Sequence, residues 1–305
     1  MPESGYFDLQ VNGYAGIDFM QAGLTVTHLE TACRALERDG VAGVLATVIT
    51  DTMDVMADRI ASLVLARAQS EVAARVIQGF HIEGPFLNPE NGYRGAHPVD
   101  AIRPANWEDM QKLLDAADGL TRLVTLAPEH DEGFGVTRRL VAQGILVSAG
   151  HSDASLDELK GGIDEGISMF THLGNACPMQ MHRHDNIIQR ALSLSDRLWI
   201  CVIADGVHVP FPALSNIIRA AGVDHCIVVT DAIAPASLGP GRYTMSRWDL
   251  SIGEDMVARA PDGSHFVGSA ITMRRAAENL MSGLGLSLKQ VEMLTSLNPR
   301  RALDL

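Results

Sequence analysis

Four side chains that can bind a metal ion or carry a proton stand where apolar, strand-like segments of the sequence end. Glu83 ends a segment that begins near Val76, His151 and His172 follow two later segments, and Asp231 follows a fourth. One glutamate, two histidines and one aspartate at strand ends have the composition of a hydrolytic metal centre. The sequence therefore indicates metal-assisted hydrolysis.

The residues after Glu83 show why it is an unusual position for a charge. A Gly-Pro pair follows it directly and cannot continue strand pairing. A carboxylate at this position is unlike a core residue, and its side chain can instead point into a cavity at the end of the strand. The alternatives are a structural ion pair for Glu83, core histidines that bind no metal for His151 and His172, and a helix N-cap for Asp231.

Eight strand-like segments alternate with helical ones and predict how these side chains are positioned. The expected strands lie at 6–13, 44–48, 76–83, 120–126, 145–149, 167–171, 199–203 and 226–230. Most are continuously apolar, as strands buried on both faces of a parallel sheet are. The alternation predicts an α/β protein with the (β/α)8 TIM barrel fold. We expect residues 1–305 to form one barrel domain, with a short β insertion near 239–265.

Helix start signals set the expected ends of two helices. Thr27 and Glu30 have capping-box spacing and predict a helix over Thr27–Asp39, and Ser155 and Glu158 predict another over Ser155–Ile163. A helix with Met53, Met56, Ile60, Leu63 and Val64 on one face follows the second strand. Further helices are expected at 107–117, 135–143, 187–194, 211–221, 272–281 and 287–294.

Composition argues against several classes of partner. The chain has 24 basic and 37 acidic residues, a formal net charge of −13, which disfavours nucleic acid and anionic membrane surfaces. An anionic small substrate then requires local cations or a metal ion in the cleft. The four cysteines form no CxxC pair, and no apolar run reaches membrane-spanning length. We expect buried free thiols and a cytoplasmic enzyme.

Nine segments of the sequence, in order, carry a resemblance to one family. They are FDLQVNG, HIEGPFLNP, GAHP, SAGHSDAS, THLGNACP, IADGVHV, VVTDAIAPA, GSAITM and NPRRALDL. Through them the chain resembles the N-acetylglucosamine-6-phosphate deacetylases of the amidohydrolase superfamily. The resemblance implies a divalent metal ion, zinc or alternatively iron, and hydrolysis of the acetamide of N-acetylglucosamine 6-phosphate to glucosamine 6-phosphate and acetate.

The resemblance also implies a role for individual residues. Glu83, His151 and His172 would hold the metal, Asp231 would act as general base and then general acid, and His97 would polarise the substrate carbonyl. The residues that would contact the amino-sugar phosphate are Ala96, His97, Asn175, Ala176, Arg183, Gly206, Val207, His208, Val267 and Gly268. A loop histidine and solvated surface residues are the alternatives for His97, Arg183 and His208.

Two departures from the pattern modify these expectations. Many amidohydrolases have His-x-His at the end of the first strand, whereas this chain has Gln10 and Asn12, amides that bind zinc poorly. We therefore expect one metal ion per chain. The family's small β-sandwich is expected to be absent, because the sequence begins at the first strand and stops at Leu305. The resemblance also implies that the loop Asn175–Asn186 reaches across a dimer interface in related enzymes, and we expect a homodimer.

Two other functions stay open on the sequence alone. One is a related amidohydrolase that deacetylates another N-acyl sugar or amine. The other is a catalytically silent barrel that binds a sugar phosphate. Asp231 argues against the second, because a binding module has no use for a group that carries protons.

Overall fold

A parallel sheet of eight strands forms the centre of the computed structural model, which describes residues 2–245, 248–259 and 266–305. In order around the sheet they are β1 (Tyr6–Val11), β4 (Val41–Ile49), β5 (Ile77–Glu83), β6 (Thr121–Leu126), β7 (Leu146–Ala149), β8 (Ile167–Phe170), β9 (Trp199–Ile203) and β10 (Cys226–Val229). A parallel bridge between Val11 and Ala232 joins the first strand to the exit of the last. The predicted eight-stranded barrel is confirmed.

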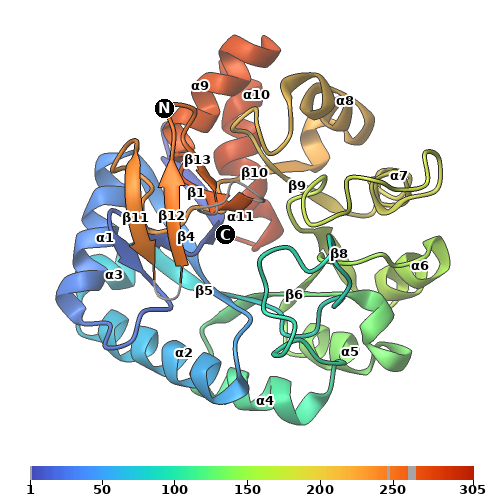
Figure 1. The fold of residues 1–305 in the computed structure, drawn as a ribbon, viewed down its shortest axis with the longest axis horizontal. Coiled ribbons are helices and arrows are strands. Elements are labelled where there is room, and N and C mark those ends of the chain that lie inside the picture. The colour runs from blue at the N-terminus through green and yellow to red at the C-terminus, as the bar shows by residue number, and fades with distance from the viewer. Residues whose placement is uncertain (1, 246–247, 260–265) are drawn as a thin grey trace.

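Helices surround the sheet in chain order (Figure 1). They are α1 (Val26–Arg38), α2 (Met53–Ala68), α3 (Glu71–Val76), α4 (Trp107–Ala116), α5 (Gly135–Ala142), α6 (Leu156–Asp164), α7 (Ile187–Leu192), α8 (Phe211–Ala221), α9 (Met273–Leu284), α10 (Leu288–Glu292) and α11 (Asn298–Ala302). Short 3-10 turns lie at Pro128–His130, Glu132–Phe134 and Val223–His225, and a π-helical turn at Met293–Leu297 joins α10 to α11. The sequence pattern did not predict α3 or α11.

The core has two layers. Apolar side chains such as Val44, Phe80 and Ile200 face outward from the strands and pack against the helices. A smaller cluster, which includes Phe7 and Leu45, fills the barrel interior. Burial on both faces explains why the strands have continuously apolar sequences.

The start of α1 differs from the prediction. Thr25 is the N-cap, and its hydroxyl accepts a hydrogen bond from the His28 backbone N–H, while the His28 ring accepts from the Thr25 N–H. The prediction of Thr27 and Glu30 was wrong because a histidine, and not an acid, occupies the third helical position. The capping box of Ser155 and Glu158 is confirmed.

A second sheet follows the last barrel strand and is antiparallel. It consists of β11 (Gly241–Met245), β12 (Trp248–Ile252), β13 (Val257–Arg259) and β14 (Phe266–Ser269), and β11 and β12 lie in front of the barrel in Figure 1. A parallel bridge between Ala232 and Ser269 attaches this sheet to the exit of β10. Apart from it and the hairpin β2 (Gly13–Tyr14) with β3 (Ile17–Asp18), the described residues contain no strands outside the barrel, and hence no β-sandwich.

Asn298 links segments of the chain at the end of the barrel opposite the strand exits. Its buried amide donates hydrogen bonds to the carbonyls of Val223 and Cys226, both at 2.8 Å. We expect Asn298→Ala to lower the free energy of unfolding by about 1–3 kcal/mol, because buried carbonyls lose their donor. Chemical denaturation measures this change, and a loss below about 0.5 kcal/mol, the scale of a neutral surface substitution, would contradict the role.

Candidate active site

The candidate ligands and the candidate base leave the ends of four barrel strands. Glu83 is the last residue of β5, and His151, His172 and Asp231 each follow within two residues of the ends of β7, β8 and β10. These three have left-handed backbone conformations, with φ of 51°, 30° and 50°. Such conformations cost about 1–3 kcal/mol each and cluster at functional sites. The sharp turn directs each side chain across the barrel mouth.

Each strained residue is held by a hydrogen bond to its own carbonyl. Two donors are backbone N–H groups from other segments, Asn88 to His151 at 2.9 Å and Ser269 to Asp231 at 3.1 Å. The third is the N–H of Asn175, in the same loop as His172, at 3.0 Å. The loop after Glu83 is fixed differently, because Gly84 has φ of 84° and a Cβ there would lie 2.1 Å from the Thr50 hydroxyl. The backbone is thus held in place at all four positions.

Three potential ligand atoms form a small triangle. Glu83 Oε1 lies 3.3 Å from His151 Nε2 and 3.2 Å from His172 Nε2, and the two nitrogens are 3.1 Å apart. All three residues are buried. Neighbouring ligand atoms in a tetrahedral zinc site, with zinc–ligand distances of about 2.0–2.1 Å, are about 3.3–3.4 Å apart. The triangle therefore has nearly the dimensions of one face of such a site.

The protonation of His151 supports the same interpretation. Its Nδ1 lies 2.9 Å from the carbonyl oxygen of Tyr93, which can only accept, so Nδ1 carries a proton. In neutral His151 the lone pair of Nε2 then points toward the triangle. A backbone partner that fixes the tautomer in this way is typical of metal-binding histidines. The donor set fits a divalent cation.

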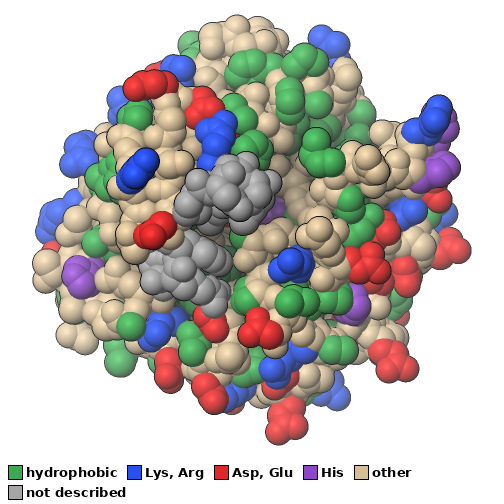
Figure 2. All heavy atoms as spheres, in the orientation of Figure 1, with side chains coloured by type: hydrophobic (Ala, Val, Ile, Leu, Met, Phe, Trp, Pro, Cys, Tyr) green, Lys and Arg blue, Asp and Glu red, His purple; other side chains and the backbone are tan. Residues whose placement is uncertain are grey.

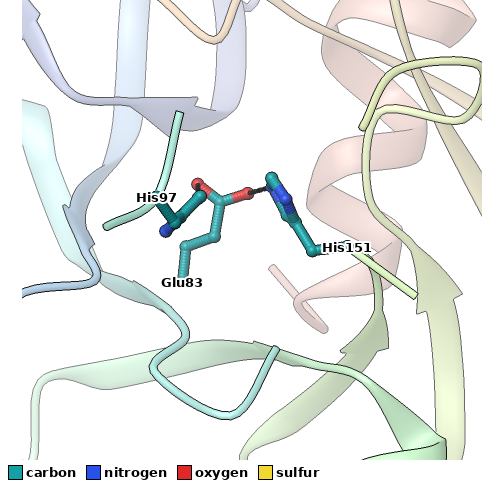
Figure 3. A group of neighbouring side chains, drawn as sticks. All are labelled: Glu83, His97 and His151. Carbon is teal, nitrogen blue, oxygen red and sulfur yellow. Dashed lines mark ion pairs between the residues drawn. The ribbon is translucent and has the colours of Figure 1, made fainter. Parts of the chain in front are cut away.

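His97 offers a second set of ligands. Glu83, His97 and His151 also have potential ligand atoms within 4.8 Å of one another, and Figure 3 shows them converging. His97 Nε2, however, is 4.0 Å from Oε2, the other oxygen of Glu83. Its ring lies edge-on to that of His151, with centroids 4.3 Å apart. The tighter triangle favours His172 as the ligand and leaves His97 beside it, facing the same space.

The electrostatics of the triangle favour positive charge. Burial acts to raise the pKa of Glu83, but hydrogen bonds and charge from His151 and His172 hold it well below its usual range. Burial acts to lower the pKa of His172, and the hydrogen bond and charge of Glu83 outweigh it and raise that pKa. Both shifts mean that the site stabilises an anionic carboxylate beside a cation.

Asp231 is held by the two amides of the first strand and its exit. Gln10 Nε2 donates to Asp231 Oδ1 and to Glu83 Oε1, both at 3.1 Å, and Asn12 Nδ2 donates to the same Asp231 oxygen at 2.7 Å. Burial and the charge of Glu83 raise the pKa of Asp231 to about 6, against the opposing charge of His172. The sequence pattern identified Gln10 and Asn12 only as poor metal ligands. Their contact with Asp231 is a role that it missed.

A layer of hydroxyl groups lies below the ligands. His81 Nε2 contacts Thr125 Oγ1, Thr125 contacts Thr171, and Thr171 contacts Ser148, each at 2.7 Å. Burial lowers the pKa of His81 to about 4, so this ring is neutral at pH 7. The layer gives the polar ends of neighbouring strands buried partners directly beneath the site.

The predicted sugar-phosphate residues occupy several loops around the mouth. The ring Nδ1 of His208 donates a hydrogen bond to Asp205 Oδ2, and the other oxygen of this carboxylate accepts from the backbone N–H groups of Val207 and His208. The ring of His208 packs against Phe266 of β14 at a centroid distance of 4.8 Å. Asp205 and Phe266 are further neighbours that the sequence did not reveal, although an acid two residues after β9 was a visible signal.

The remaining predicted contacts are placed as follows. Ala96 and Ala176 are half-buried in their loops, and the Asn175 side chain donates to the His172 carbonyl at 3.2 Å. Gly206 and Gly268 both have positive φ. Val267 belongs to β14, but its side chain lies outside the described part of the structure. Arg183 is exposed, in a loop that projects outward before α7 (Figure 1). Its side chain is therefore not packed against the triangle within the same chain.

The fold and the site together define a class of protein. A (β/α)8 barrel that gathers a carboxylate, imidazoles and a buried aspartate at the carboxyl ends of its strands has the architecture of a metal-dependent hydrolase.

No helix among the described residues is both long and apolar enough to cross a membrane. All four cysteines are free thiols, and three of them are buried.

Comparisons with known proteins identify the family. The sequence matches no protein-family model. It is 32% identical to the N-acetylglucosamine-6-phosphate deacetylase of Bos taurus, over 99% of this chain and 74% of the relative. It is 29% identical to the N-acetylgalactosamine-6-phosphate deacetylase of Escherichia coli O157:H7, over 98% of this chain and 77% of the relative.

A solved structure agrees with these relatives. A mutant N-acetyl-D-glucosamine-6-phosphate deacetylase from Mycobacterium smegmatis, in complex with N-acetyl-D-glucosamine-6-phosphate, matches with a TM-score of 0.88 and 27% identity, over 99% of this chain and 77% of that chain. The chain belongs to the N-acetylglucosamine-6-phosphate deacetylase family.

The triangle predicts one tight metal site per chain. Titration of the metal-free protein with zinc should show one tight equivalent, and His151→Ala or His172→Ala should abolish tight binding. His130→Ala, at a half-buried histidine outside the cluster, is the matched control and should bind as the wild type does. Two tight equivalents, or normal binding by His172→Ala, would show that the ligand set is wrong.

The amide contacts predict a separate effect on turnover. Asn12→Ala removes a hydrogen bond to the Asp231 carboxylate, and bonds to charged groups contribute about 1.5–3 kcal/mol. We expect kcat to fall about 10- to 100-fold while the zinc content stays at one equivalent. A variant that loses zinc together with activity would instead place Asn12 among the determinants of metal binding.

Proposed function

We propose that this protein hydrolyses the acetamide of N-acetyl-D-glucosamine 6-phosphate to glucosamine 6-phosphate and acetate. The observation that carries the proposal is the buried triangle of Glu83, His151 and His172 with Asp231 beside it. Family membership supports the substrate class. We propose zinc as the single bound ion and a reducing cytoplasm as the location, in keeping with the four free thiols.

The reaction needs a nucleophile, an electrophile and a proton carrier. A bound divalent ion supplies Lewis acidity, which makes water more acidic and amide carbonyls more electrophilic. Asp231 accepts the proton of the attacking water and returns it to the departing nitrogen, because an amide anion is too basic to leave at neutral pH. The raised pKa of Asp231, about 6, suits a group that must both accept and donate.

His97 and Gln10 have supporting roles in this proposal. His97 faces the same space as the triangle and donates a hydrogen bond to the substrate carbonyl oxygen as negative charge develops there. Gln10 contacts both carboxylates and keeps Asp231 at a fixed distance from Glu83. These residues orient the reacting groups before the substrate arrives, which lowers the cost of reorganisation.

The phosphate must be bound against the charge of the whole protein. The net charge is −13, and Figure 2 shows acidic side chains scattered over the face in view, with lysine and arginine side chains among them. His208, whose ring is held by its contact with Asp205, lines the site proposed for the phosphate. Because Arg183 is exposed on a projecting loop, we propose that it binds the phosphate in the site of a second copy, within a homodimer.

The E. coli relative supports one alternative substrate. That protein is named for N-acetylgalactosamine 6-phosphate, which differs from N-acetylglucosamine 6-phosphate only in the configuration at C4. The acetamide and the phosphate are common to both sugars, so the residues considered above would serve either one. The C4 hydroxyl is therefore the group that a substrate comparison must vary.

Acetate release from three sugars tests the proposal. With one equivalent of zinc, we expect the highest kcat/KM for N-acetylglucosamine 6-phosphate, a lower value for N-acetylgalactosamine 6-phosphate and the lowest for unphosphorylated N-acetylglucosamine. Asp231→Asn should retain zinc and lose at least tenfold in kcat, which corresponds to about 1.4 kcal/mol of barrier or more. Preference for the neutral sugar, or no acetate from any of them, would reject the proposed substrate.

If Arg183 binds the phosphate, its removal should lower kcat/KM for the phosphorylated sugar and not for the neutral one. Arg183→Ala should lower kcat/KM for N-acetylglucosamine 6-phosphate by about 2 kcal/mol, roughly 30-fold, through loss of a charge-assisted pair. The same variant should act on N-acetylglucosamine as the wild type does, because that sugar has no phosphate. Equal losses on both substrates would assign Arg183 to support of the loop and not to the phosphate.

A further inference from the structure

Arg190 on α7 holds the segment that follows His151. Its Nη1 donates to Asp153 Oδ1 and to the Ala154 carbonyl, both at 3.1 Å, and its side chain is only 16% exposed. Asp153 lies two residues after the candidate ligand, and the Asp153 carbonyl is a further, longer contact at 3.4 Å. The guanidinium thus binds the backbone and the side chain of the segment that leaves His151.

The same guanidinium also holds the end of the projecting loop. Arg190 Nε donates to Asp185 Oδ1 at 2.6 Å, and Nη2 donates to the Asp185 carbonyl at 3.3 Å. Asp185 directly precedes the N-cap of α7, Asn186, and closes the loop that carries Asn175 and Arg183. One planar group therefore joins the His151 segment to the loop proposed to bind the sugar phosphate.

Glu129 and Tyr93 also hold the His151 segment. Glu129 accepts from the Asp153 N–H at 2.7 Å and from the Ser152 hydroxyl at 2.6 Å. Asp153 also neighbours the mostly buried Tyr93, where burial and the hydrogen bond to Asp153 raise the pKa of the hydroxyl. The carbonyl of Tyr93 is the acceptor that orients the His151 ring. Displacement of Asp153 would therefore disturb His151 through the chain and through Tyr93.

The two loops also touch directly. A Cβ added at Gly92 would lie 2.8 Å from the Cα of Pro178, so the loop that contains Tyr93 packs closely on the loop that contains Arg183. Arg190 is then not an isolated surface ion pair. It closes a ring of contacts that runs from His151 through Tyr93 and the projecting loop back to Asp153.

We propose that Arg190 is a positioning residue that fixes the ring of His151 and, at the same time, the loop that recognises the substrate. This proposal rests on the proposed function in that His151 binds the metal and the loop binds the sugar phosphate. Arginine suits the role because its planar fork donates in several directions at once, whereas lysine presents a single point charge. Groups that hydrogen-bond a metal ligand directly, as the Tyr93 carbonyl does to His151, typically change metal affinity 10- to 100-fold when they are removed. Arg190 acts on His151 through Tyr93 and through the chain.

The test compares Arg190→Ala and Arg190→Lys with the wild type. Zinc affinity is measured by competition with a chelator, and KM and kcat are measured with N-acetylglucosamine 6-phosphate. We expect Arg190→Ala to weaken zinc binding about 10- to 100-fold and to raise KM several-fold. Arg190→Lys should fall between it and the wild type. Arg197→Ala is the matched control, because Arg197 pairs with Asp164 on the outer surface, and should change neither quantity.

A second variant separates the two arms of the contact and does not depend on whether Arg190→Ala folds. Asp185 is exposed, and Asp185→Ala releases only the projecting loop. We expect it to raise KM while zinc affinity stays within about threefold of the wild type, a difference of about 0.7 kcal/mol.

Two results would overturn the inference. One is wild-type zinc affinity in Arg190→Lys and Arg190→Ala, even with a lower thermal midpoint, because the contact would then only stabilise the fold. The other is an unchanged KM in Asp185→Ala. Either result leaves zinc binding and acetate release by the wild type intact, whereas a wild type that binds no zinc and releases no acetate would reject the proposed function itself.

Discussion

The constraint on which the site depends is the close approach of electron-rich atoms in a buried space. Glu83 Oε1, His151 Nε2 and His172 Nε2 lie 3.1–3.3 Å from one another, and the tautomer of His151 directs a lone pair into the triangle. Such an arrangement is unfavourable unless a cation or a proton lies among these atoms. The left-handed turns at His151 and His172, and the N–H groups that hold their carbonyls, maintain it.

The amides at the first strand give the site its asymmetry. Gln10 and Asn12 donate hydrogen bonds and cannot supply the imidazole nitrogens that a second zinc ion would need. They hold Asp231 close to Glu83. Burial and the charge of Glu83 raise the pKa of Asp231 to about 6, although the hydrogen bond from Asn12 acts to lower it. The β11–β14 sheet reaches the same region, because Ser269 binds the Asp231 carbonyl and Phe266 packs on His208.

The barrel and the candidate ligands can be predicted from the sequence because short segments of the chain carry the signal for both. Continuous apolar segments that end in Glu, His or Asp identify the strands and the side of the barrel that carries the chemistry, and the structure brings Glu83, His151 and His172 together. The roles of Gln10 and Arg190 depend on contacts between residues far apart in the chain, which no spacing reveals. The start of α1 was misplaced for a local reason, since His28 replaces the usual acid of a capping box.

The ligand set is the claim that one spectroscopic measurement tests most directly. X-ray absorption spectra of protein with one equivalent of zinc should show an N/O shell at about 2.0–2.1 Å with outer-shell scattering from two imidazoles. In His97→Ala the same two-imidazole signal should persist if the ligands are Glu83, His151 and His172, as proposed. Loss of one imidazole in His97→Ala, with the signal unchanged in His172→Ala, would contradict the account and assign the site to Glu83, His97 and His151.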